Sequence, residues 1–207
     1  EVPPARSARA GMAQATVIQA RLDSISPETH MVVSSDGGAT THTYYTGVNN
    51  FSVVGGDPTA LAPTFQGFCI DLYQSISFGS NNMFTVSPLE TAPSPTSGMG
   101  IAKADLLREL WGRHYSPSFT NTEGAAFQSA VWEIVFDSGL NLGSGTVQIS
   151  GDPGVVATAT AWLGSLNGDH AYFAPVYALT SESTQDMLVP GPGVLALAGA
   201  GVVVAAR

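Results

Sequence analysis

The feature that most constrains the fold is a change of hydrophobic period along the chain. Over the first ninety residues, short β-forming runs are separated by Gly, Pro and Asn, a pattern typical of antiparallel strands joined by turns. From residue 101 onward apolar residues recur at intervals of three and four, which indicates helices, and short β-runs return near residue 172. This order predicts one α+β domain, mainly an antiparallel β-sandwich or barrel, with an inserted small helical subdomain of about three helices.

The expected strands are short and closely spaced. A Gly-rich turn at residues 36–38 lies between two β-runs, which predicts a hairpin. Strands are expected at residues 15–22, 31–34, 40–46, 50–54, 64–72, 83–86, 147–150, 172–180 and 187–189.

The three expected helices have recognisable ends. Thr120 and Glu123 form the pattern of a capping box at the start of the second helix, and Gly139 is expected to stop it. Asp152 followed by Pro153 marks the start of the third helix. The helices are expected at residues 101–115, 121–137 and 153–167.

Composition narrows the possible functions. The chain has 16 Asp and Glu against 7 Lys and Arg, with Lys103 its one lysine. Clustered cations for phosphate contacts are therefore missing, and no nucleic-acid partner is expected. Low charge, 23 Gly and 13 Pro are typical of an extracellular β-rich protein. The single cysteine, Cys69, excludes an internal disulfide framework and argues against structural zinc, so no metal or cofactor is expected.

The two ends of the chain differ from its middle. Residues 1–11 contain two prolines, two arginines and no periodicity, so this segment is expected to be disordered. At the other end, the Pro-Gly-Pro-Gly motif of residues 190–193 precedes an apolar run at residues 194–206. As a helix this run would span about 20 Å, less than the ~30 Å hydrocarbon core of a bilayer. A terminal helix or strand packed on the core is the plain alternative.

The order of a short Pro motif, a brief apolar segment and a terminal Arg207 resembles the PEP-CTERM sorting signal of bacteria that possess an exosortase. Gly191 stands where the motif usually has Glu, and one arginine replaces the usual cluster. The resemblance implies an exported protein at the cell surface or in the extracellular matrix. It also implies a transient membrane anchor at residues 194–206 and processing by an exosortase-type enzyme.

Gln128 is an anomaly of the second helix. At about 100° per residue, Ser129, Glu133 and Asp137 fall together on a side expected to face water. Gln128 falls on the apolar flank, beside Trp132. A buried amide without partners costs about 1–3 kcal/mol, so Gln128 must be hydrogen bonded, most simply to the backbone of a neighbouring loop. Taken alone, Cys69 among apolar neighbours is likewise expected to be core packing.

Two motifs link these residues to a family. Residues 68–71, Phe-Cys-Ile-Asp, resemble the aromatic-Cys-Ile/Val-acid motif of bacterial thioester domains at the tips of surface adhesins. Residues 127–132, Phe-Gln-Ser-Ala-Val-Trp, resemble the second motif of that family, although many members have Thr at the position of Phe127. The overlap extends loosely over residues 15–189.

The resemblance implies the site and the domain boundaries. In that family the sulfur of the Cys and the side-chain carbonyl of the Gln are joined as an internal thioester. Cys69 and Gln128 would form this bond here, supported by Phe68, Asp71 and Trp132. Residues 12–189 would be a single thioester-type domain, and residues 190–207 the sorting segment.

The thioester would act once and without turnover, so the protein is not expected to be an enzyme. An amine or hydroxyl on a surface or matrix ligand would attack the Gln128 carbonyl and release the Cys69 thiol, leaving a covalent link. Bond formation needs a thiolate, for which His114 or the neighbouring Asp71 is the candidate base.

Three other functions remain open from the residues. One is a structural matrix or cell-surface protein of the same fold that has no thioester and binds non-covalently. Another is a hydrolase that pairs Cys69 with His114 or His170, although no protease-type pattern surrounds the cysteine. The last is calcium binding at the acidic Gly loops of residues 36–38 and 167–169, which lack EF-hand spacing.

Overall fold

The computed structural model describes residues 15–95 and 97–191. Its elements are β1 (Thr16–Ser34), β2 (His42–Gly56), β3 (Thr64–Cys69), β4 (Asn81–Pro88), η1 (Leu89–Thr91), α1 (Gly100–His114), α2 (Asn121–Phe136), β5 (Gln148–Ser150), α3 (Pro153–Leu163), η2 (His170–Tyr172), β6 (Val176–Thr180) and β7 (Met187–Pro190). The prediction of an α+β domain with three α-helices is confirmed for these residues. The predicted disordered start and the apolar run after the Pro-Gly motif lie outside them.

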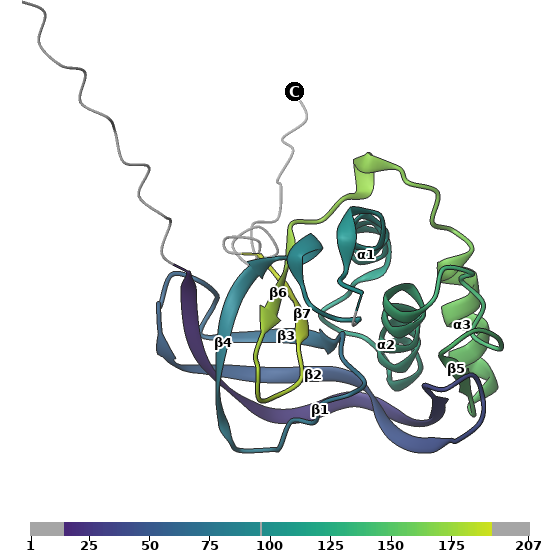
Figure 1. The fold of residues 1–207 in the computed structure, drawn as a ribbon, viewed down its shortest axis with the longest axis horizontal. Helices are drawn as coiled ribbons and strands as arrows, with labels where there is room; N and C mark the ends of the chain where they lie inside the picture. The colour runs from purple at the N-terminus through teal and green to yellow at the C-terminus, as the bar shows by residue number, and fades with distance from the viewer. Residues whose placement is uncertain (1–14, 96, 192–207) are drawn as a thin grey trace, which may run out of the picture.

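The strands close into a barrel and do not form a sandwich. Hydrogen bonding follows the order β2-β3-β7-β6-β4-β1, and β1 also pairs with β2, so six antiparallel strands make a complete ring. The short β5 adds to the far end of β1, where Val33 is opposite Ile149. Figure 1 shows the long β1 and β2 extending from the barrel to beneath the helices.

Long strands replace several of the short strands predicted from the sequence. The runs at 15–22 and 31–34 are the two ends of β1, and those at 40–46 and 50–54 both belong to β2. The sequence pattern did not predict β1 as one continuous strand, because its middle is polar. Register shifts between Leu22 and Ser24 and again before Glu28 also break the alternation of side chains there. The predicted hairpin at residues 36–38 is confirmed by the pairing of β1 with β2.

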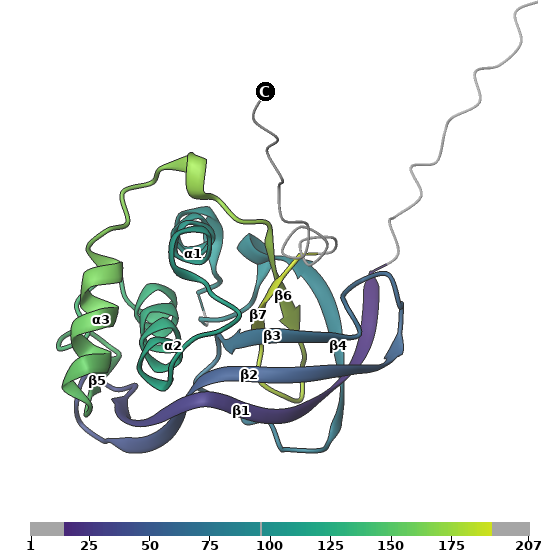
Figure 2. The same cartoon turned by 180° about the vertical axis from the view of Figure 1, so that it is seen from behind.

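The helices are inserted between β4 and β6 and cover one side of the barrel (Figure 2). α2 lies among β1, β2, α1 and α3, and all residues from Gly124 to Val135 are buried. The prediction that Ser129 and Glu133 face water is therefore wrong, since both side chains are fully buried. Helical periodicity predicts which side of a helix faces water only when one side is exposed to solvent. Neighbouring elements cover α2 on several sides.

The predicted helix starts are confirmed. The Thr120 hydroxyl accepts the backbone N–H of Glu123, whose carboxylate accepts the Thr120 N–H at 2.8 Å, which completes the capping box. Asp152 caps α3 by accepting the N–H groups of Gly154 and Val155.

The predicted helix ends are less accurate. Gly139 does not stop α2, which ends at Phe136 because Asp137 turns to extended backbone and accepts N–H groups from the loop before β5. α3 ends at Leu163, earlier than the predicted residue 167. None of the helices in residues 15–95 and 97–191 has both the length and the apolar content to cross a membrane.

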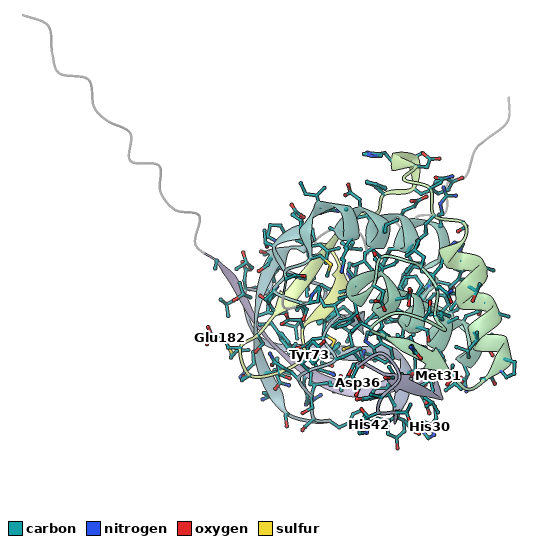
Figure 3. All side chains as sticks on the ribbon, turned by 45° about the vertical axis from the view of Figure 1, so that its right-hand side comes forward. His30, Met31, Asp36, His42, Tyr73 and Glu182 are labelled. Atoms are coloured by element: carbon teal, nitrogen blue, oxygen red, sulfur yellow. The ribbon has the colours of Figure 1, made fainter. Side chains whose placement is uncertain are left out.

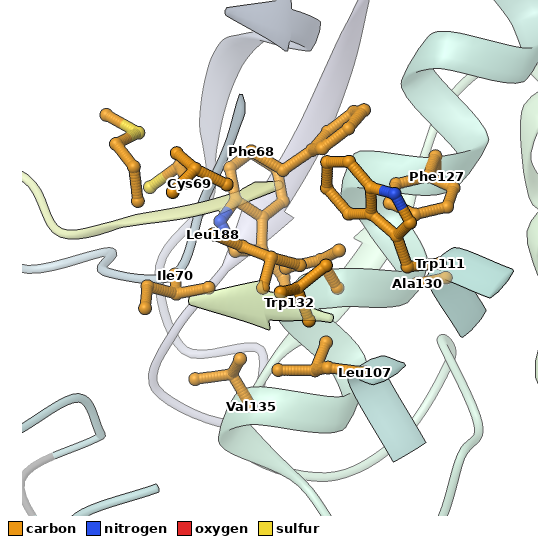
Figure 4. Packing of buried hydrophobic residues seen from close by; sticks show 14 of the residues in the cluster. Phe68, Cys69, Ile70, Leu107, Trp111, Phe127, Ala130, Trp132, Val135 and Leu188 are labelled. Carbon is orange, nitrogen blue, oxygen red and sulfur yellow. The ribbon is translucent and has the colours of Figure 1, made fainter. Parts of the chain in front are cut away.

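An aromatic cluster fixes the end of β3 against α2. The rings of Phe68 on β3 and Phe127 on α2 lie 4.4 Å apart between centroids, and Trp111 of α1 meets both rings edge-on. The close view in Figure 4 shows these rings between the strands and the helices. Because Cys69 and Gln128 directly follow the two phenylalanines in sequence, this packing sets their positions.

Candidate functional site

Cys69 is the last residue of β3 and lies at a sharp turn. Phe68 is opposite Leu188 of β7, and Cys69 is opposite Met187. The strand ends because the Asp71 carboxylate accepts the backbone N–H of Tyr73 at 2.8 Å, which closes a local turn. The Cys69 thiol is buried and donates to the Asp71 carbonyl at 2.8 Å.

The Gln128 amide pairs with the backbone of Cys69. The Cys69 N–H donates to Gln128 Oε1 at 2.8 Å, and Gln128 Nε2 donates to the Cys69 carbonyl at 2.8 Å. The prediction that buried Gln128 must bond a backbone segment is confirmed, and that segment is Cys69 itself. The structure thus brings together the two motif residues, which are 59 positions apart in the chain.

Trp132 lies one helical turn beyond Gln128 and lines the same cavity as Gln128 and Cys69. Its ring meets Tyr44 edge-on at 6.1 Å. Among the described residues, the buried Nε1–H of Trp132 has no hydrogen-bond acceptor at bonding geometry, although it is close enough to the Cys69 sulfur to lower the pKa of the thiol. Figure 4 shows Trp132 and Cys69 in the same part of the core, so the indole N–H is a donor near the thiol.

The environment of Cys69 favours the protonated thiol. Burial raises the pKa of Cys69 to about 12, and the negative charges of Asp71 and Asp186 add to this effect. The hydrogen bond with the Asp71 backbone and the Trp132 indole oppose it only in part. Attack by the sulfur at neutral pH therefore requires transfer of the thiol proton.

Asp186 does not line the cavity, but it lies close enough for its charge to act on the Cys69 thiol, and the sequence did not predict it. It is buried, its carbonyl accepts the backbone N–H of Ile70 at 3.0 Å, and its carboxylate accepts the N–H of Ser181 at 2.9 Å. Burial and then the charge of Asp71 raise the pKa of Asp186 to about 6, so it can exchange a proton near neutral pH. No sequence spacing could reveal it, because only the pairing of β3 with β7 brings Asp186 next to Ile70.

The candidate histidine bases lie elsewhere. His114 Nε2 is hydrogen bonded to the Ser165 hydroxyl at 2.8 Å, and its ring stacks on Trp162. Burial lowers the pKa of His114. His170 stacks on Phe173. Neither histidine is among the residues that line the Cys69 cavity, so the arrangement supports neither His114 as the base nor a Cys-His hydrolase.

The Cys69–Gln128 pair lies in the wall of a cavity of about 400 Å³. Residues of β1 and β2, the loop after β3, α2 and the segment before β7 contribute to it. Aromatic rings and neutral polar groups make up most of its wall. The lining residues are Ile25, Tyr44, Tyr45, Asn49, Cys69, Leu72, Tyr73, Gln74, Ser75, Ile76, Gln128, Trp132 and Gln185.

The acidic Gly loops do not assemble a metal centre in the described part of the chain. No group of three or more His, Cys, Asp or Glu side chains there is arranged to hold a metal ion. The Asp36 carboxylate is used within its own turn, where it accepts from the backbone and hydroxyl of Thr40.

In comparisons with known proteins, no family model, no curated protein and no solved structure matches the chain. The assignment of a function therefore depends on the residues and the geometry of the cavity. The two motifs meet there, beside a buried acid and an unused indole donor.

Proposed function

We propose that the protein is an exported bacterial surface protein whose Cys69 and Gln128 form an internal thioester. Through this bond it would attach covalently to an amine or hydroxyl on a surface or matrix target. The observation that carries the proposal is the reciprocal pairing of the Gln128 amide with the Cys69 backbone, with both hydrogen bonds at 2.8 Å. It supports the proposal because the reacting residues are fixed to one another within a closed core.

The bond would form by addition and elimination. Cys69 Sγ adds to Gln128 Cδ, negative charge collects on Oε1, and the Cys69 N–H that already donates to Oε1 stabilises it. The C–N bond then breaks, and the thiol proton leaves on the released ammonia, so no further reactant is needed. Holding the two groups in position can supply about 7–11 kcal/mol of the barrier.

Two neighbours have roles in this reaction. Asp186, whose charge acts on the Cys69 thiol and whose pKa is raised to about 6, is the candidate to accept the thiol proton and return it to the leaving nitrogen. The unused Nε1–H of Trp132 is the second donor for the developing charge. Phe68 holds the strand end through its contact with Phe127, and Asp71 holds the turn that carries the thiol.

The thioester would then be an electrophile that reacts once. A target amine or hydroxyl adds to the Gln128 carbonyl, its proton passes to the Cys69 sulfur, and the C–S bond breaks. The product is an amide or ester that joins the protein to its target, with the Cys69 thiol free again. Because the protein is consumed, it is an anchor and not an enzyme.

Export and anchoring are proposed from the sequence. The Pro-Gly motif and the apolar run at residues 194–206 supply the sorting segment and the transient membrane attachment, and an exosortase-type enzyme is the processing partner. Of this segment, the described part shows only its beginning: Pro190 ends β7, and the Gly191 N–H donates to the Pro175 carbonyl at 2.8 Å.

A second function is favoured by one observation. Both polar atoms of the Gln128 amide are already hydrogen bonded, and the pKa of Cys69 is raised to about 12 by burial, a state in which a cysteine is inert. The alternative is a structural cell-surface or matrix protein of the same fold that binds its partners without a covalent bond.

Intact-mass measurement separates the two functions. The thioester requires that the purified protein be lighter than its sequence by one ammonia and that methylamine convert it to an adduct. Cys69→Ala and Gln128→Ala must each abolish both effects. Gln66→Ala is the matched control, since Gln66 lies on the same strand and bonds the Tyr115 hydroxyl, so this variant must retain the mass loss.

A different intact-mass result would overturn the thioester. Full sequence mass in freshly purified protein, with a thiol that reacts with maleimide only after unfolding, establishes the buried structural cysteine and overturns the thioester. That result leaves the non-covalent function standing.

A further inference from the structure

The cavity beside Cys69 and Gln128 has the lining of a site for a neutral, hydroxyl-rich ligand. None of its lining residues in the described part of the chain carries a charge. Phosphate or carboxylate ligands require Arg or Lys contacts, which this lining does not offer. An ammonium group would lose its hydration without a carboxylate to replace it, at a cost of several kcal/mol.

The cavity is also lined by polar side chains that make no hydrogen bond to other described residues. Asn49 on β2 is 5% exposed, lines the cavity, and makes no side-chain hydrogen bond to any described residue. Gln74 and Ser75 line it as well, and their side chains are likewise without hydrogen bonds to the described residues. The amide of Asn49 makes part of the cavity wall, where a ligand or water can supply donors and acceptors.

Two exposed tyrosines flank the cavity. Tyr45 is 60% exposed and Tyr73 is 57% exposed, which is high for rings of this size. Each is supported by another ring: His30 meets Tyr45 at 4.5 Å, and Phe136 meets Tyr73 at 5.6 Å, both edge-on. Figure 3 labels Tyr73, and it labels His30 at the lower edge of the view. Supported aromatic faces beside amide groups suit a pyranose ring, which has apolar C–H faces and a hydroxyl rim.

We propose that this cavity binds a neutral saccharide and, resting on the proposed thioester function, that a hydroxyl of the bound saccharide attacks the Gln128 carbonyl. Tyr45 and Tyr73 hold the sugar ring, and Asn49 and Gln74 bind its hydroxyls. The nucleophilic oxygen forms an ester bond to Gln128 Cδ, the C–S bond breaks, and the hydroxyl proton passes to the sulfur of Cys69. A hydroxyl enters as a neutral group, so the uncharged cavity accepts it without the cost of desolvating an ion.

Binding is tested apart from the reaction with the Cys69→Ala variant, which cannot form a thioester but keeps the backbone groups that hold Gln128. Isothermal titration calorimetry compares neutral tetrasaccharides of glucose, galactose, mannose and N-acetylglucosamine with tetragalacturonate and tetraglucosamine. At least one neutral tetrasaccharide is expected to bind both wild type and Cys69→Ala more tightly than the two charged probes.

The tyrosine variants locate the site. Tyr45→Ala and Tyr73→Ala are each expected to weaken binding of that neutral tetrasaccharide by about tenfold or more. Tyr172→Ala is the matched control, because Tyr172 is an exposed tyrosine that does not line the cavity, and it should bind as wild type does. Failure of every neutral probe to bind, tighter binding of a charged probe, or equal loss in Tyr172→Ala overturns the saccharide site.

The reaction has a separate readout. Wild type that shows the ammonia loss should gain the full mass of the bound tetrasaccharide and release one thiol, and hydroxylamine should remove the adduct because esters are cleaved by it. A protein that shows the ammonia loss and binds the sugar without gaining its mass overturns hydroxyl delivery alone. A protein that shows no ammonia loss overturns the thioester, while the calorimetry still decides the binding site.

Discussion

Gln128 on α2 and Glu109 on α1 are both buried polar side chains that bond a backbone segment 59 residues away along the chain. Glu109 accepts the N–H groups of Asn167 and Gly168 and the guanidinium of Arg113. Burial alone would raise the pKa of Glu109, but these donors outweigh it, and the pKa is lowered. The contacts with Asn167 and Gly168 join α1 to the segment after α3, while Arg113 lies one turn along the same helix.

The surroundings of Gln128 are different. Its amide is satisfied by one residue, Cys69, and next to it lie a protonated thiol, the indole N–H of Trp132, which has no acceptor among the described residues, and a cavity. On the proposed thioester function, these groups would serve the reaction. The comparison teaches that the two junctions differ in what surrounds the buried hydrogen bonds: donors that satisfy a carboxylate at Glu109, and a thiol and an indole N–H at Gln128.

The largest effect is expected from breaking the Glu109 junction. Glu109→Ala should lower the free energy of unfolding by about 3–5 kcal/mol, because it leaves two N–H groups without their acceptor and takes the carboxylate partner from the partly buried Arg113. Urea unfolding followed by circular dichroism measures it. Glu90→Ala is the control: Glu90 forms a more exposed ion pair with Arg108, and its loss should cost no more than about 1 kcal/mol. Equal losses in the two variants would remove the structural role given to Glu109.

The next effect tests whether Cys69 and Gln128 are covalently joined. A crosslink that closes a loop of 59 residues stabilises the folded state by about 4 kcal/mol through the entropy of the unfolded chain. Cys69→Ala should therefore cost about 4 kcal/mol if the thioester is present, and about 1 kcal/mol if the thiol is only packed in the core. Wild type opened by methylamine should unfold at nearly the same urea concentration as Cys69→Ala.

The two regions should also respond to pH in opposite directions. Burial raises the pKa of Asp186 from 3.8 to about 6, so the folded state binds this proton more tightly than the unfolded state does. Its stabilisation, up to about 3 kcal/mol, is present below pH 3.8 and is lost as the pH rises through 6. The lowered pKa of Glu109 acts in reverse, since its stabilisation is lost as the pH falls below 4.5.

Asp186→Asn isolates this effect. The difference in unfolding free energy between wild type and Asp186→Asn should change between pH 4 and 7. As the pH rises, the unfolding free energy of wild type should fall relative to that of the variant. Glu133→Gln should remove a second, separate part of the dependence of unfolding free energy on pH, because burial also raises the pKa of Glu133 to about 6. A constant difference across this range contradicts the assignment of Asp186 as the acid that titrates near neutrality.

The parts of this molecule that the sequence predicted are those set by local chemistry. The capping box at Thr120 and the Asp152 cap follow from hydrogen bonds within one turn of chain, and the apolar flank of α2 correctly implied that Gln128 is buried and bonded. The meeting of Cys69 with Gln128 was expected from motif resemblance, not from any rule of spacing.

The parts that the sequence did not predict depend on long-range packing. β1 is one long strand because β2 pairs along almost its whole length, even where its own alternation fails. Ser129 and Glu133 are buried because other elements cover the side of α2 that its own period assigned to water. Asp186 joins the site through the neighbouring β7, more than a hundred residues after Cys69.

The smallest effect on stability is expected at Trp132, the donor that most clearly separates the two junctions. Trp132→Phe keeps an aromatic ring against Tyr44 and removes an N–H that has no acceptor among the described residues, so the free energy of unfolding should change by less than about 1 kcal/mol. If that N–H stabilises charge on Gln128 Oε1, refolded Trp132→Phe should lose ammonia more slowly than wild type by intact mass. Trp111→Phe changes a buried ring of the neighbouring aromatic cluster and should leave this rate unchanged. Equal rates in all three proteins would show that the Cys69 N–H alone serves the amide oxygen, and the unused indole would then be no more functional than the donors around Glu109.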